Sequence, residues 1–146
     1  MAIKIGVKLL DSGICRASEI KGCKEVDLRA IEVSIDAQLP KAYTAIMKEI
    51  GRGCGEFLSD VQMFYPAVLG LTEVARTMVS GHLALPADAF VFASRYGEQF
   101  LFFHTGTSED AEVFRWSDDE PEQFRKVFES IWDFIEEELI AHLGVQ

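Results

Sequence analysis

The strongest constraint on the fold comes from two aromatic runs, residues 89–96 and 100–104, which lie on either side of a short connection that begins with Gly97 and Glu98. Both runs are rich in residue types that favour β-strands. Because the connection between them is so short, they can pair only as an antiparallel hairpin, and Gly97 in the first loop position favours a type II′ turn. Apolar and polar residues alternate only imperfectly along these runs, so we expect both faces of the hairpin to be covered.

The first half of the chain predicts a strand followed by two helices. Apolar residues alternate with polar or small ones over residues 3–9, which is the pattern of a strand. Apolar residues then recur at helical spacing over residues 25–38. Pro40 suits the first turn of the next helix, where its missing N–H would be unpaired in any case. We expect Gly51 to end that helix as a left-handed cap.

The second half adds the strands and two further helices. The pattern predicts strand-like segments at 56–58 and 62–65, a helix over 71–81, a strand at 112–116 and a closing helix over 124–139. Together these elements indicate an α+β fold, with helices packed around a twisted, mainly antiparallel sheet and a long C-terminal helix. A doubly wound α/β fold is disfavoured because the hairpin supplies no parallel crossover. No linker or repeat is visible, so we expect a single domain over residues 1–146.

Composition excludes the disordered and membrane-spanning classes. The chain has 146 residues, 49% of them hydrophobic, with 11 phenylalanines. That is enough apolar surface for a compact core. The longest uninterrupted hydrophobic run, residues 89–93, has five residues, far below the ~20 needed to cross a bilayer. The N-terminal alternation also lacks the continuous apolar block of a secretory signal, so we expect a cytoplasmic protein.

Cysteine and histidine spacing predicts no metal site and no cofactor. Cys15, Cys23 and Cys54 are odd in number and match no zinc or redox motif, which favours reduced thiols. The histidines are far apart in sequence, without any i, i+4 pair. No Gly-x-Ser-x-Gly motif occurs either, so we expect no enzyme.

The charge is distributed unevenly along the chain. Residues 1–50 hold 8 basic and 7 acidic residues, whereas residues 51–146 hold 6 basic and 17 acidic ones, for a total of −10. Nucleic acid is therefore excluded as a partner, because phosphate binding needs a basic patch. A basic protein is the better electrostatic match.

The densest acidic stretch is the candidate contact surface. It is formed by the loop that follows the strand at 112–116, with a tryptophan at its start, and its candidate residues are Trp116, Asp118, Asp119, Glu120 and Glu122. This pattern is consistent with two alternatives. The loop is either simply solvated, or it binds a basic protein. Trp116 borders the loop, so we expect it to be half exposed unless it belongs to the core.

Several short motifs follow one another along the chain. They are carried by the Phe-rich hairpin, the closing helix and the residues Glu32, Leu39, Pro40, Tyr43, Gly51, Gly53, Phe64, Tyr65, Pro66 and Gly97. In this order, and over about residues 25–140, the motifs resemble the SUKH superfamily, which includes the fungal cell-wall-assembly regulator of the Smi/Knr type and many bacterial toxin-immunity proteins. Arg52 departs from the pattern by interrupting the usual glycine pair.

The resemblance implies a non-enzymatic α+β domain that, in bacteria, commonly neutralises a toxin encoded nearby by binding to it. It implies a protein partner, no membrane or nucleic acid, and a monomer or weak homodimer. The alternative is a small-ligand sensor or regulatory adaptor that uses an aromatic pocket near His104, the histidine at the end of the second hairpin run.

Overall fold

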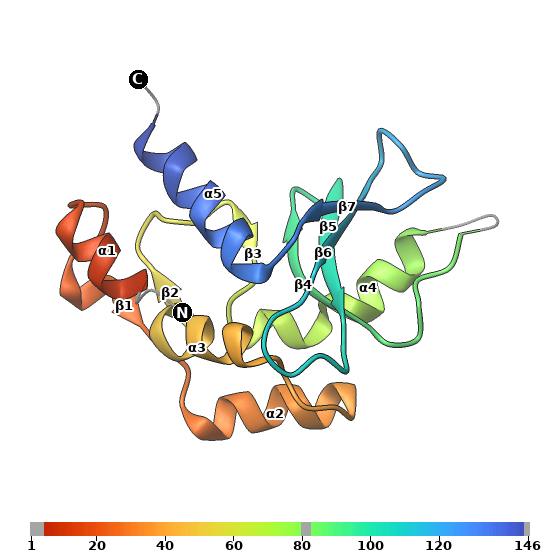
Figure 1. Cartoon of the computed structure of the whole chain (residues 1–146), viewed down its shortest axis with the longest axis horizontal. Coiled ribbons are helices and arrows are strands. Elements are labelled where there is room, and N and C mark those ends of the chain that lie inside the picture. The colour runs from red at the N-terminus through yellow and green to blue at the C-terminus, as the bar shows by residue number, and fades with distance from the viewer. Residues whose placement is uncertain (1–4, 80–82, 145–146) are drawn as a thin grey trace.

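A computed structural model describes residues 5–79 and 83–144, and its centre is a five-stranded antiparallel sheet (Figure 1). The strands lie in chain order, so each pairs with its sequence neighbours. They are β3 (Val61–Gln62), β4 (Ala89–Arg95), β5 (Gln99–His104), β6 (Val113–Ser117) and β7 (Arg125–Phe128). This sheet and the closing helix confirm the predicted α+β class.

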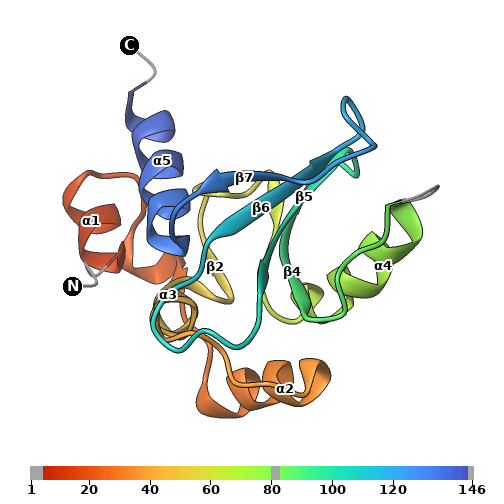
Figure 2. The same ribbon diagram turned by 45° about the vertical axis from the view of Figure 1, so that its right-hand side comes forward.

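Helices cover the sheet from two sides. They are α1 (Ile5–Asp11), α2 (Glu25–Ile35), α3 (Lys41–Ile50), α4 (Leu71–Met78) and α5 (Ile131–Leu143), with 3-10 turns η1 (Ala17–Glu19) and η2 (Ala67–Gly70) and a small ladder of β1 (Ile20–Lys21) and β2 (Gly53–Cys54). Helices α3 and α5 lie on one side of the sheet, and α4 lies on the other side, next to β4 (Figure 2). Helix α2 forms the outer layer beyond α3 (Figures 1 and 2).

The aromatic hairpin is covered on both faces, as its sequence predicts. On one face the ring of Tyr43 from α3 packs against Phe90, Phe92 and Phe103 at centroid distances of 5.6, 6.1 and 5.6 Å. On the other face Phe102 is 1% exposed, and its ring stacks on that of a β6 phenylalanine. Edge-to-face and offset contacts of this kind stabilise a core beyond the area that they bury.

The turn of the hairpin differs from the predicted type II′ geometry. Tyr96 and Gly97 occupy the two central positions with φ of 58° and 68°, and the N–H of Glu98 donates to the carbonyl of Arg95 at 3.1 Å. Two positive φ angles inside an i to i+3 hydrogen bond define a type I′ turn. The chain therefore reverses one residue earlier than predicted, and Gly97 occupies the second central position, where a type I′ turn also requires a positive φ.

Residues 5–9 of the predicted N-terminal strand belong to helix α1, and the first two residues of that prediction lie outside the described part of the chain. The alternating pattern contains Ile5 and Leu9, which lie one helical turn apart and are 2% and 0% exposed, whereas Val7 between them is 51% exposed. The N–H of Gly6 donates to the Glu49 carboxylate of α3 at 2.8 Å. The spacing of the apolar residues is compatible with a strand or a helix, and packing against α3 favours the helix.

The boundary of the C-terminal helix was also predicted wrongly. Residues 125–128 form the edge strand β7, and α5 begins only at Ile131. The side chain of Ser130 accepts a hydrogen bond from the N–H of Asp133 at 3.0 Å, which satisfies one of the free donors at the helix start. Apolar residues in β7 happen to continue the helical spacing of α5, and pairing with β6 decides their conformation.

Two further expectations in the middle of the chain are corrected. Gly51 has φ of −62° and is not a left-handed cap; instead, a Cβ there would lie 2.4 Å from both the Met47 carbonyl and the Cys23 sulfur. Residues 56–58 form a turn, and the strands nearby are the two-residue β2 and β3. Helix α4 ends at Met78, and the predicted end at Gly81 lies outside the described residues.

Pro40 precedes α3 as its N-cap, one position before the helical turn in which it was expected. The first N–H groups of α3 have no acceptor within the helix. Those of Lys41 and Ala42 donate instead to the carbonyls of Ser108 and Glu109, at 2.9 and 2.8 Å. The β5–β6 connection therefore caps α3 through its backbone. No helix in the described ranges is long and apolar enough to cross a membrane.

Candidate partner-binding surface

Trp116 is a buried residue that forms a hydrogen bond to the acidic loop. It lies at the end of β6, is 5% exposed, and stacks on Phe100 with ring centroids 5.4 Å apart. Its indole Nε1 donates to the carbonyl of Pro121 in the loop at 3.2 Å. The residue is therefore buried rather than half exposed, and it fixes the position of the loop between β6 and β7.

The loop is also tied to the neighbouring hairpin turn. The N–H of Asp118 donates to the carbonyl of Glu98 at 2.9 Å, and the N–H of Asp119 donates to the hydroxyl of Ser117 at 3.2 Å. Figures 1 and 2 both place the β4–β5 turn and the β6–β7 loop at the same end of the sheet. The backbone of the loop is thus held in place without using the carboxylates of these residues.

Glu120 is occupied by an internal partner. Arg125 of β7 donates to both of its carboxylate oxygens, from Nε at 2.6 Å and from NH2 at 2.7 Å. These two hydrogen bonds hold the pKa of the Glu120 carboxyl below its usual value. Glu120 therefore closes the loop onto β7 with a carboxylate that already has an internal partner.

Asp118, Asp119 and Glu122 are exposed, and within the described part of the chain their carboxylates form no ion pair. Several acidic residues before and after the loop do form ion pairs. Glu109 pairs with Lys41, Glu112 and Glu129 with Lys126, Glu136 with Lys8, and Glu138 with Arg95. The uncompensated charge of the loop is therefore concentrated on the three exposed carboxylates of Asp118, Asp119 and Glu122, which we call the acidic end.

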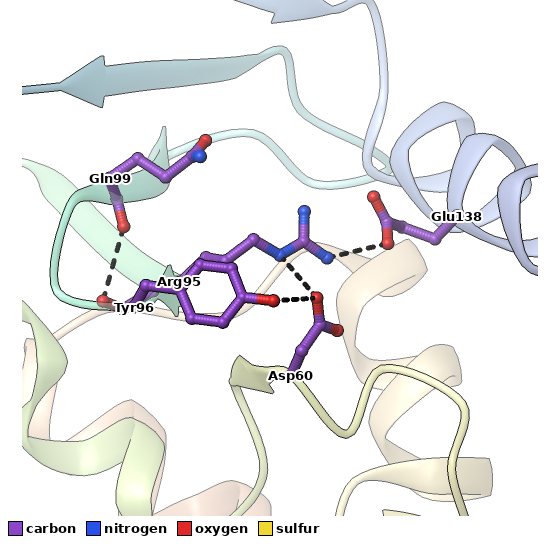
Figure 3. A network of polar contacts seen from close by, with 6 residues as sticks. Asp60, Arg95, Tyr96, Gln99 and Glu138 are labelled. Atoms are coloured by element: carbon purple, nitrogen blue, oxygen red, sulfur yellow. Dashed lines mark hydrogen bonds and ion pairs between the residues drawn. The ribbon is translucent and has the colours of Figure 1, made fainter. Parts of the chain in front are cut away.

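An ion-pair cluster centred on Arg95 lies next to the hairpin turn. In Figure 3 the guanidinium of Arg95 lies between two carboxylates, with Nε 3.1 Å from Asp60 and NH2 2.9 Å from Glu138 of α5. Tyr96 donates from its hydroxyl to Asp60 at 3.3 Å. The cluster joins the segment before β3, the hairpin and α5. Sequence reasoning missed it because its members are up to 78 residues apart in the chain.

Most of the family-motif residues build the scaffold. Glu32 accepts a hydrogen bond from the N–H of Leu39 at 3.0 Å and so shapes the turn between α2 and α3. The N–H of Tyr65 donates to the carbonyl of Gly51 at 2.7 Å, next to a cis bond between Tyr65 and Pro66. Of the other motif residues, Leu39, Pro40 and Tyr43 are buried, Gly53 and Gly97 have positive φ, and Phe64 packs partly buried against the core.

Arg52, the departure from the glycine pattern, has an internal role. Its guanidinium donates twice to Asp27 of α2, with both distances 2.8 Å, and lies 4.9 Å from the ring centroid of Tyr65. The Arg52 side chain and the N–H of Lys24 together lower the pKa of the Asp27 carboxyl. The residue that interrupts the glycine pair thus ties α2 to the segment after α3.

His104 lies at the margin of the aromatic sheet face. Its Nδ1 is 2.8 Å from Asp88, and its ring packs against Phe102 and Phe114 at 5.7 and 5.2 Å. A cavity of 180 Å³ nearby is lined by Asp88, Thr105, Phe90 and mainly polar residues of α2 and α4. The aromatic pocket near His104 therefore stays a prediction.

The cysteines are free, buried thiols. Burial raises the pKa of Cys23 to about 11 and that of Cys54 to about 12, and it also raises the pKa of Cys15. Within residues 5–79 and 83–144, no group of three or more histidine, cysteine or acidic side chains is arranged to hold a metal ion.

Comparison with known proteins identifies one similarity. Residues 22–137 match the model of the SMI1 / KNR4 family (SUKH-1), which agrees with the resemblance seen in the sequence motifs. A search of curated proteins found no match.

Proposed function

Because the chain belongs to the SMI1 / KNR4 family (SUKH-1), we propose that it is a non-enzymatic protein-binding module. Its proposed role is that of a cytoplasmic bacterial immunity protein, which neutralises a cognate toxin by direct binding. The partner is a basic protein, and a nuclease toxin domain fits this description because such domains carry positive charge for their own substrate. The acidic end, formed by Asp118, Asp119 and Glu122, is the proposed contact surface.

The observation that carries the proposal is that the backbone of the loop is held in place while three of its carboxylates are exposed and unpaired. Backbone hydrogen bonds, the Trp116 indole and the Glu120–Arg125 pair fix the loop, while the three carboxylates point to solvent without an internal cation among the described residues. A preorganised surface loses little conformational entropy when it binds. Uncompensated negative charge also speeds the approach of a basic partner.

The test is a kinetic binding measurement with the toxin domain encoded by the neighbouring gene. The variant carries Asp118→Asn, Asp119→Asn and Glu122→Gln, and it leaves Glu120 in place because that residue holds the loop. At ~50 mM salt we expect the association rate to fall about tenfold, while the dissociation rate changes less than about threefold. Raising the salt to ~500 mM should slow the wild type towards the variant.

A matched control removes the same charge from elsewhere. Asp11→Asn, Glu56→Gln and Glu137→Gln alter three exposed residues on α1, the β2–β3 connection and α5, and none of them forms an ion pair within the described residues. The control variant should associate at nearly the wild-type rate. Equal slowing of both variants would mean that only net charge matters, and an unchanged rate in the first variant would reject the acidic end as the contact surface.

A further inference from the structure

The outer face of α2 carries two exposed valines. Val26 is 69% exposed and Val33 is 72% exposed. They lie seven residues apart with Ala30 between them, so the three side chains follow one another along one face of the helix at spacings of four and three residues. This is the spacing of the apolar seam along which two helices pack in a coiled coil. The outer face of α2 therefore has the pattern of one half of a helix pair.

These valines contribute little to the core of their own chain. Helix α2 packs on the core through its opposite face, where Leu28 and Ile31 are 5% and 0% exposed. It is the outer layer beyond α3, and Figures 1 and 2 both place it on the opposite side of the molecule from the β6–β7 loop. A partner on the outer face of α2 would therefore touch neither the core nor the acidic end.

Two opposite charges flank the valines along the same side of the stripe. Arg29 lies near the middle of α2, and Asp36 is its C-cap, seven residues later. Both are exposed, and neither forms an ion pair within residues 5–79 and 83–144. The neighbouring Glu25 and Glu32 already have internal partners. The outer face therefore presents one unpaired cation near its middle and one unpaired anion at its end.

These two charges become complementary when α2 meets a second copy of itself. In an antiparallel pair that places Ala30 opposite Val33 of the second copy, Arg29 lies beside Asp36 of the second copy, at the flanking positions that form ion pairs between helices. The two-fold axis of such a pair repeats the contact, so the interface contains two of these ion pairs. Residues 1–50 hold 8 basic and 7 acidic residues, so this part of the chain carries little of the net charge that would keep two copies apart.

We propose that the outer face of α2 is the interface of a weak, symmetric homodimer, in which two α2 helices pack antiparallel and exchange Arg29–Asp36 ion pairs. The inference does not depend on the proposed function, because the acidic end of each copy stays exposed in such a dimer. A helix of 11 residues is about 16 Å long, so the pair buries less than the ~1,200 Å² of ordinary stable interfaces. The dimer therefore forms only at high protein concentration.

The experiment measures the rotational correlation time of the full-length chain by NMR relaxation at several protein concentrations. Between ~0.05 and ~1 mM we expect the value for the wild type to rise towards about twice that of the monomer. Val33→Lys places a charge in the seam and should keep the monomer value at ~1 mM. Val74→Lys is the matched control, since it alters a valine of α4 that is 57% exposed, and it should dimerise like the wild type.

Two charge reversals test the ion pairs. Arg29→Glu and Asp36→Lys each bring like charges together across the interface, so each variant alone should dimerise at least about tenfold more weakly than the wild type. In an equimolar mixture of the two variants every reversed side chain meets an opposite charge, and association should return to within about threefold of the wild type. Circular dichroism checks that each variant is folded. If Asp36→Lys is unfolded, because Asp36 has a left-handed backbone, Arg29→Glu alone decides whether the charges matter.

Four results would overturn the inference. A correlation time that does not change with the wild-type concentration would exclude the dimer, and a dimer that survives Val33→Lys would place the interface on another face. A mixture that associates no better than its two components, or a folded Arg29→Glu variant that dimerises like the wild type, would exclude the antiparallel pairing. If the wild type is monomeric and the signals of α2 shift only when the neighbouring gene's toxin domain is added, that partner rather than a second copy occupies the face.

Discussion

At Asp27 a single carboxylate connects the start of α2 to the segment after α3. It accepts two hydrogen bonds from Arg52, after α3, and one from the N–H of Lys24 at the start of α2. The side chain is 4% exposed, and its charge is compensated within the fold. Loss of that charge would leave the Arg52 guanidinium without its bidentate partner.

This pair predicts a specific acid sensitivity. The folded state lowers the pKa of Asp27, so the stability that the pair supplies is complete above the unfolded value of about 3.9 and is lost as the pH falls through the folded pKa. We expect the free energy of unfolding, measured by urea titration between pH ~6 and ~3, to fall more steeply for the wild type than for Asp27→Asn.

Asp118→Asn is the control for this measurement, because Asp118 is exposed and has no ion pair in the described part of the chain. Its slope against pH should match that of the wild type. If Asp27→Asn were as acid-sensitive as the wild type, the Arg52–Asp27 pair would not contribute to the pH dependence.

At the scale of single elements, the start of α5 decides where strand becomes helix. Ser130 accepts the N–H of Asp133, and replacing an N-cap serine by alanine typically costs about 1 kcal/mol. We therefore expect Ser130→Ala to lower the free energy of unfolding by about that amount. Ser34→Ala on exposed α2, which removes a hydroxyl from outside any cap, should change it by less than about 0.5 kcal/mol. Equal effects would contradict the capping role.

The hairpin is the element on which most of the core depends. Phe102 is 1% exposed and contacts aromatic rings of β6 and of the loop before β7. Phe102→Ala should lower the free energy of unfolding by about 3–5 kcal/mol, because it removes a large buried ring and leaves a cavity.

Val33→Ala is the comparison for this substitution, since Val33 on α2 is 72% exposed. It should cost less than about 0.5 kcal/mol in the same chemical denaturation experiment. A loss below about 1 kcal/mol for Phe102→Ala would mean that the hairpin is a surface element.

At the scale of the whole molecule, three buried thiols report on global unfolding. Cys15, Cys23 and Cys54 are 4%, 8% and 1% exposed, and burial raises the pKa of each. A thiol reagent such as Ellman's reagent should therefore label less than about one thiol in ten at pH ~8 in the native protein, since it needs an accessible thiolate. Denaturant should expose all three. Rapid labelling of one thiol without denaturant would reveal local opening at that site.

Local patterns in the sequence were sufficient for the hairpin and for helices α2, α3 and α4. Their apolar residues recur with the period of the element that they form, and the spacing of Tyr43, Ile46, Met47 and Ile50 places one face of α3 against the sheet. The motif order also pointed to the family that the comparison identifies. The acidic character of the β6–β7 loop could also be predicted, because the density of charged residues can be counted directly in the sequence.

Tertiary contacts decided the rest, because they act between residues that are far apart in the chain. Ile5 and Leu9 suit a strand or a helix until α3 supplies a surface to pack on, and residues 125–128 continue a helical pattern until β6 offers a strand to pair with. Trp116 is buried because Phe100 lies opposite it, and Glu120 is neutralised because β7 brings Arg125 to it. The sequence by itself determined that the chain carries an acidic surface. Only the folded structure determined which carboxylates of that surface have no ion-pair partner among the described residues.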